Sequence, residues 1–223
     1  MSTLGIGVSL FSVLAKPSYS VVILPTVILI ALYQKWKGRS VNWMLLIVSI
    51  ILPSGVMLGI QSLSYNMGGL IFAPLAVIDE WARLYNPAAS AGLLVKLILS
   101  LLFLITVYGL YFEDARRNMP LNFAWLGFAF GVCYTYLLAE SSRVEYGNLV
   151  WSGQIALFIL FVMSLAFFAC QNWQLLAADV SGKRTPRFMI GLAILALHLV
   201  SGIVWYLAHL SGMTTTDMQW YLW

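Results

Sequence analysis

The sequence predicts an all-α, polytopic integral membrane protein with about six transmembrane helices in a single transmembrane domain, residues 1–223. Only 9% of the residues are charged and 61% are hydrophobic, whereas roughly a quarter of the residues of a soluble domain are charged. The charges fall in short clusters between apolar runs of about 20 residues, the length that an α-helix needs to cross a bilayer. Basic clusters recur at every second connection, which is typical of cytoplasmic loops.

The first apolar segment, residues 3–15, is shorter than a span. As a helix it would cover roughly 20 Å, less than the roughly 30 Å of the hydrocarbon core. Lys16-Pro17 interrupts the run, because proline disfavours helical geometry in the residue before it and is tolerated at the start of a new helix. We therefore expect a half-helix, an interfacial helix or the remnant of a longer span here.

Six fuller apolar runs follow, separated by polar or charged connections. They cover residues 19–34, 41–61, 89–112, 120–139, 149–171 and 188–210. The loops after the first, third and fifth runs hold eight basic residues, whereas those after the second and fourth hold two. The positive-inside rule then makes the loops 35–40, 113–119 and 172–187 cytoplasmic and places the C-terminus outside.

The connection 62–88 is more than a simple loop. Its residues 75–85 predict a short amphipathic helix on the outer surface, stabilised by burying one face at the headgroup boundary. The expected apolar face comprises Leu75, Ile78, Trp81, Ala82 and Tyr85. The expected polar face comprises Asp79, Glu80 and Arg83.

A second polar cluster joins the fourth and fifth spans, in the segment ESSRVEYGN at residues 140–148. Arg143 there can bind a phosphate through its planar fork, and Glu140 and Glu145 would orient it or contact sugar hydroxyls. The alternative is that both carboxylates only pair with Arg143 at the rim of two helices, an arrangement that contributes little to stability. If this cluster converges with that of Asp79, Glu80 and Arg83, the two would form an outward headgroup or sugar site.

Other polar residues within the apolar runs favour structural roles. Lys96 lies near the outer end of its span, where its stem can reach the headgroups, and His198 is expected to be packed and hydrogen-bonded. Cys133 and Cys170 lack a metal or redox motif, so we expect two small buried side chains. The sequence thus predicts no metal, no cofactor and no nucleic-acid partner.

Two stretches resemble a known family. They are LAKPSY at residues 14–19, before the apolar run 21–32, and LAESSR at residues 138–143, followed by YGNLVW at 146–151 and the apolar run 158–168. Both resemble the C-terminal membrane half of bacterial GT-C-type glycosyltransferases, which take a sugar from a polyprenyl-phosphate carrier on the outer face of the membrane. The resemblance implies a location in the bacterial inner membrane.

The departure from that family concerns catalysis. Its enzymes carry a catalytic acidic residue in the first outward loop of an N-terminal half, and Asp79, Glu80 and Glu140 do not occupy the matching position. The resemblance therefore implies a carrier-binding scaffold or part of a split transferase, with no catalytic residue of its own.

We accordingly expect a membrane-embedded scaffold that binds a polyprenyl-phosphate-linked sugar, together with a membrane-protein partner or further copies of itself. The alternative is a non-catalytic structural subunit of a larger respiratory, photosynthetic or secretion complex. Seven residues are candidates for substrate binding: Arg143, Glu140, Glu145, Asn148, Arg83, Glu80 and Lys16.

Overall fold

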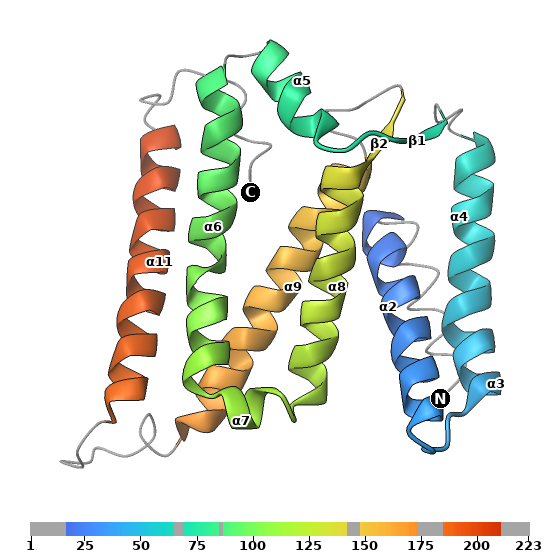
Figure 1. The fold of residues 1–223 in the computed structure, drawn as a ribbon, viewed down its shortest axis with the longest axis horizontal. Helices are drawn as coiled ribbons and strands as arrows, with labels where there is room; N and C mark the ends of the chain where they lie inside the picture. Colours follow the sequence, from blue (N-terminus) through green and yellow to red (C-terminus); the bar gives the residue numbers. More distant parts are fainter. Residues whose placement is uncertain (1–16, 65–68, 85–86, 142–147, 174–184, 211–223) are drawn as a thin grey trace. The chain divides into compact units, whose positions relative to one another are not determined.

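A computed structural model describes residues 17–64, 69–84, 87–141, 148–173 and 185–210, and at some helix ends only the backbone is described. The short N-terminal segment therefore lies outside the described residues. Figure 1 shows that the described residues form mostly long helices. Their bounds are α2 Pro17–Trp36, α3 Trp43–Leu46, η1 Ile47–Ile51, α4 Leu52–Ser64, α5 Ala76–Leu84, α6 Pro87–Leu110, α7 Phe112–Ala115, α8 Met119–Leu137, α9 Asn148–Gln171 and α11 Pro186–Leu210.

The all-α membrane class is confirmed. Within the described residues, four helical segments are long and apolar enough to cross a membrane: Pro17–Trp36, Trp43–Ile60, Leu149–Gln171 and Pro186–Val204. The two other predicted spans correspond to α6, of which Val95–Leu110 is an apolar helical stretch with described side chains, and to α8. Both are helical where the sequence predicts them, and the six-span count stays a prediction.

The second predicted span is a helix with one irregular turn. It runs through α3 and α4, which the π-helical segment η1 joins at Ile47–Ile51. Pro53 follows directly. Proline has no N–H to donate, and its ring collides with the carbonyl four residues earlier, here that of Ser49. A wider turn relieves this collision, which explains the local change of helix type.

The chain divides into two compact units, the first formed by Met1–Tyr85 with Phe123–Ile159 and the second by Asn86–Asn122 with Leu160–Trp223.

In the first unit, small and hydroxyl side chains let α2, α8 and α9 approach closely. The hydroxyl of Ser152 donates to the Ser18 carbonyl over 3.2 Å, and that of Thr135 to the Leu149 carbonyl over 3.1 Å. Helices in lipid associate through such close packing and polar contacts rather than through the hydrophobic effect.

Two glycines on α8 also allow its neighbours α2 and α9 to approach closely. A Cβ on Gly131 would lie 2.8 Å from the Cβ of Ala156 on α9. One turn earlier, a Cβ on Gly127 would meet Val22 and Thr26 of α2 at 3.5 and 3.6 Å, which is ordinary contact. The two ends of this Gly-x-x-x-Gly motif therefore serve two different neighbouring helices.

The second unit has an aromatic core instead. The Phe103 ring of α6 lies 5.5 Å from Phe161 and 6.0 Å from Phe168, both on α9. Phe188 of α11 stacks on Phe168 at 5.9 Å, and His198 stacks on Phe161 at 5.0 Å. The expected packing of His198 is thereby confirmed, and the expected hydrogen bond of its ring stays a prediction.

The predicted 113–119 connection is a tight turn built around α7. The Asn122 amide donates to the carbonyls of Ala115, Arg116 and Asn118 and accepts from the Tyr108 hydroxyl. These bonds satisfy carbonyls that the helix ends would otherwise leave without partners. They hold the beginning of α8 against the end of α6.

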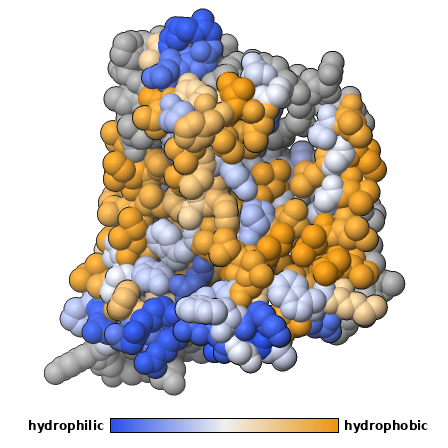
Figure 2. Space-filling view, turned by 45° about the vertical axis from the view of Figure 1, so that its right-hand side comes forward, coloured by the Kyte–Doolittle hydropathy of each residue, from blue (hydrophilic) through white to orange (hydrophobic). Residues whose placement is uncertain are grey.

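Apolar side chains cover the flanks of the helices, and hydrophilic residues gather toward the helix ends (Figure 2). This distribution is expected where lipid is the solvent for the flanks. Cys133 and Cys170 are among the exposed residues. The expectation that they are buried is therefore wrong, because each lies on a helix face that no other described helix covers.

Candidate functional site

The first unit contains a small sheet that joins two of the predicted outer segments. Strand β1, Leu70–Phe72, pairs antiparallel with β2, Leu138–Glu140, so that Leu70 is opposite Glu140. The pairing continues beyond the strands, because Ser141 N donates to Gly69 O over 3.1 Å and Ala73 N to Leu137 O over 3.0 Å. The connection after α4 is thus tied to the end of α8, and α5 follows directly from β1 (Figure 1).

The turn from β1 into α5 has a strained residue. Leu75 has φ 60°, a left-handed conformation that is costly for a side chain with a Cβ. Its N–H donates to the Tyr136 carbonyl over 2.6 Å, and its own carbonyl accepts from Ile78 N over 2.8 Å. Such a conformation persists where the surrounding bonds fix it, and it occurs often in functional regions.

Helix α5 confirms the predicted amphipathic element, although its buried residue differs from the prediction. Val77 is 3% exposed and packs this helix against the first unit, whereas Leu75, predicted on the apolar face, is 50% exposed. The reason is the turn at Leu75, which sets where the helix begins and rotates its faces. Asp79 and Arg83 are exposed, as predicted.

Glu80 and Arg83 form a two-point ion pair one turn apart on α5. The Arg83 Nε donates to Glu80 Oε2 over 2.9 Å, and Nη2 donates to Oε1. The hydrogen bond from Arg83 lowers the pKa of the Glu80 carboxyl. Because the pKa is lowered, the pair stabilises the fold at pH values above the ordinary pKa of a carboxyl group. This contribution is lost as the pH falls through the pKa of Glu80 in the folded protein. At neutral pH the guanidinium is therefore held on the surface of α5.

Glu140 is less exposed than the alternative of an ion pair at the rim of two helices would require. It is the last residue of β2, lies opposite Leu70 and is only 8% exposed. The expected helix over 120–139 in fact ends at Leu137, so residues 138 and 139 belong to the strand. A carboxylate that is shielded from water in this way is stabilised by hydrogen bonds or by an opposite charge.

The structure describes three of the predicted site residues with their side chains. Glu80 and Arg83 pair with each other on α5, and α5 contacts β2, the strand that ends at Glu140. Asn148 is the first residue of α9, and its side chain is not described. Arg143, Glu145 and Lys16 lie outside the described residues.

The sheet of β1 and β2 is not among the elements that the sequence predicts. A short signal existed for β1: Leu70, Ile71 and Phe72 are apolar, follow Gly68-Gly69 and precede Pro74. A β-branched and aromatic run bounded by glycine and proline is typical of a strand. Without its partner, which is 66 to 70 residues away in the chain, the run also fits an apolar loop.

No family model, no curated protein and no solved structure matches this chain. The function must therefore be inferred from the residues that the fold brings together.

Proposed function

We propose that this chain is a membrane-embedded scaffold that binds the phosphate-bearing headgroup of a polyprenyl-linked sugar at the end of the first unit where β1 and β2 pair. In this proposal that end faces outward from a bacterial inner membrane. The chain has no catalytic residue of its own and acts beside a second membrane chain or a further copy of itself.

The observation that carries this proposal is the pairing of Leu70 with Glu140. It fixes the segment that leads to Asp79, Glu80 and Arg83 against the strand that leads into the 142–147 loop. The acidic-basic cluster of α5 thus follows one strand of the sheet, and the sequence that contains Arg143 follows the other. A sugar phosphate needs both kinds of group, since guanidinium binds phosphate and carboxylates accept from hydroxyls.

Rigidity at this end also supports binding. Val77 anchors α5, and the hydrogen bonds of Leu75 and Ser141 fix both ends of the paired segment. The Glu80 carboxylate orients the Arg83 guanidinium before a ligand arrives. Preorganised donors lower the entropy that is lost when a ligand binds.

The test is an affinity series for undecaprenyl phosphate, measured by native mass spectrometry. We expect Arg143→Lys to weaken binding about 10- to 150-fold, because lysine keeps the charge but loses the planar fork that is worth about 1.5–3 kcal/mol. Arg83→Lys should weaken binding by a smaller factor, since Glu80 already engages this side chain. Arg187→Lys, a conservative exchange at the beginning of α11, is the matched control.

Absence of wild-type binding would contradict the proposal. So would an affinity that Arg143→Lys and Arg83→Lys both leave unchanged, or that Arg187→Lys lowers equally. Each variant should first give the wild-type circular dichroism spectrum.

The second candidate function, a structural subunit of a larger complex, is favoured by one feature of α4. Gly55 and Gly59 form a Gly-x-x-x-Gly motif and are exposed, and a Cβ added at either position would meet no atom of the described residues within 4 Å. The same motif on α8 is covered by α2 and α9. In membranes such motifs allow close helix–helix approach.

Association through α4 gives a direct prediction. Gly55→Ile and Gly59→Ile should each lower the fraction of protein that associates in nanodiscs, because a branched side chain keeps a partner helix at a distance. Gly109→Ile on α6, where there is equally open space, is the control. The measurement is the mass distribution of the intact assemblies. A wild-type monomer, or equal effects of all three exchanges, would count against this role.

A further inference from the structure

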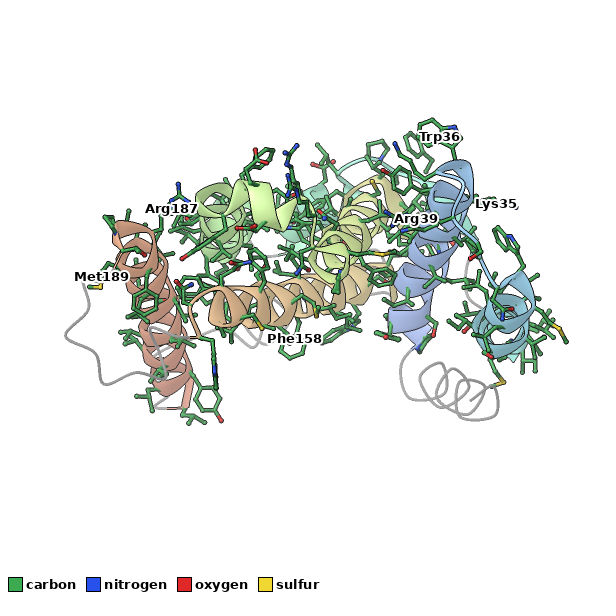
Figure 3. The ribbon with its side chains drawn as sticks, turned by 90° about the horizontal axis from the view of Figure 1, so that it is seen from below. Lys35, Trp36, Arg39, Phe158, Arg187 and Met189 are labelled. Carbon is green, nitrogen blue, oxygen red and sulfur yellow. The ribbon has the colours of Figure 1, made fainter. Side chains whose placement is uncertain are left out.

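The turn between α2 and α3 concentrates positive charge that has no acidic counterpart nearby in the sequence. Lys35, Lys37 and Arg39 lie within five residues, and the first acidic residue of the chain is Asp79. Figure 3 shows Lys35, Trp36 and Arg39 gathered around the end of α2. We name residues 33–39 the basic turn.

Hydrogen bonds fix the backbone of the basic turn. Gly38 has φ 74°, a left-handed conformation that suits glycine and ends the helix. Lys37 N donates to Tyr33 O, Gly38 N to Lys35 O and Arg39 N to Gln34 O, each over 3.0 Å. On the other side, Asn42 caps α3 by accepting from Leu45 N over 3.0 Å. The three cations therefore project from an ordered turn.

Two aromatic rings position the middle cation. The Lys37 ammonium lies 5.1 Å from the centroid of the Trp36 ring and 5.7 Å from that of Tyr33, within the range of a cation–π contact. Trp36 is 78% exposed. Tryptophan and tyrosine favour the boundary between hydrocarbon and headgroups, so this geometry places the ammonium at headgroup depth.

An apolar stripe leads along α2 to the basic turn. Leu29, Leu32, Tyr33 and Trp36 are each exposed and are spaced at intervals of three and one residues, which puts them on one face of the helix. The first three precede the cations along α2, on the side of the membrane interior, as acyl chains extend inward from a lipid phosphate. The surface thus offers apolar contact and positive charge in the order in which a phospholipid presents its chains and headgroup.

A second group of basic residues within the described part of the chain, around α7, differs from the basic turn in its charge balance. Around α7, Arg116 pairs with Glu113, and Arg117 is close in sequence to Asp114. Two acids thus accompany two bases there. The attraction for an anion is therefore stronger at the basic turn.

We propose that the basic turn is a binding site for an anionic phospholipid, with the lipid phosphate at Lys35, Lys37 and Arg39 and an acyl chain along Leu29, Leu32 and Tyr33. Basic residues next to a membrane-spanning helix attract anionic lipids electrostatically. The site is separate from the carrier site and does not depend on it.

The experiment uses the full chain in nanodiscs of phosphatidylcholine containing a minor fraction of phosphatidylglycerol, with the retained lipids counted by native mass spectrometry. Wild-type protein should retain phosphatidylglycerol in excess of its share. Each cation should contribute about fivefold in affinity. Lys35→Gln/Lys37→Gln/Arg39→Gln should therefore abolish the excess, whereas Lys35→Arg/Lys37→Arg should keep it.

Arg116→Gln/Arg117→Gln is the matched control and should leave the excess unchanged. The Trp36 ring acts through the Lys37 ammonium. Trp36→Leu should therefore weaken phosphatidylglycerol retention more in the wild-type protein than in the Lys37→Gln variant. An unchanged excess in the triple variant, or an equal loss in the control, would overturn the proposal. Undecaprenyl phosphate binding is measured on the same variants and should not change, which separates this site from the proposed function.

Discussion

Replacing Gly131 by alanine is expected to destabilise the first unit by about 1–3 kcal/mol, the usual cost of overpacking a close helix contact. The added Cβ would lie 2.8 Å from the Cβ of Ala156 and 3.1 Å from the Gly153 Cα. Both neighbours are parts of α9 that no rotamer change can move aside. The gain in helix propensity, about 1 kcal/mol from glycine to alanine, is too small to offset the clash.

Gly127→Ala is the internal control for this prediction. It lies one turn away on the same helix, and its Cβ would make only ordinary contacts with Val22 and Thr26. It should therefore be neutral or stabilising. Reversible unfolding in mixed detergent micelles, followed by circular dichroism, measures both free energies. Equal effects of the two exchanges would contradict the close packing of α8 against α9.

Gly191→Ala should have a comparable effect in the second unit. The new Cβ on α11 would overlap the Phe168 ring, with the Cζ atom at 2.9 Å. That ring is 3% exposed and is held by Phe188 and Phe103, so it cannot turn away without disturbing the aromatic core. We expect a loss of about 1–3 kcal/mol.

The matched exchange on the same helix is Gly202→Ala, where a Cβ meets no described atom within 4 Å. The same unfolding assay should find it neutral or stabilising. If Gly191→Ala is as stable as Gly202→Ala, the packing of α11 on the end of α9 needs revision.

The positions of the long helices could be predicted from sequence because lipid leaves few alternatives. A backbone in hydrocarbon must satisfy its hydrogen bonds internally, so an apolar run of sufficient length becomes a helix. The runs 149–171 and 188–210 accordingly match α9, Asn148–Gln171, and α11, Pro186–Leu210, within two residues. The amphipathic helix α5 was predicted by the same kind of local pattern.

Contacts between distant segments could not be predicted in this way. Three residues of β1 pair with three of β2, and neither strand is long enough to give a clear periodic signal. The buried Glu140 ends β2, and the strained Leu75 lies in the turn that follows β1. The wide turn η1 depends on a local cause, Pro53, but the pattern of apolar residues continues through it.

The candidate site was predicted only in part. Its residue types and the two clusters follow from where charge interrupts the apolar runs. The sheet, which local sequence patterns do not predict, pairs the strand that precedes α5 with the strand that ends at Glu140. Glu80 and Arg83 pair on the surface of α5, the side predicted to be polar, and Glu140 is buried at the end of β2.

The most direct test of the central claim, that the end of the first unit marked by β1 and β2 binds a carrier headgroup, is photocrosslinking with an undecaprenyl phosphate whose photoreactive group lies next to the phosphate. The protein is embedded in nanodiscs with its natural membrane partner where one copurifies, and crosslinked peptides are identified by mass spectrometry. The account predicts labelling of peptides from both 70–84 and 138–148, with competition by unlabelled undecaprenyl phosphate and none by phosphatidylglycerol. Labelling confined to the basic turn, or spread evenly over the exposed helix ends without competition, would contradict it.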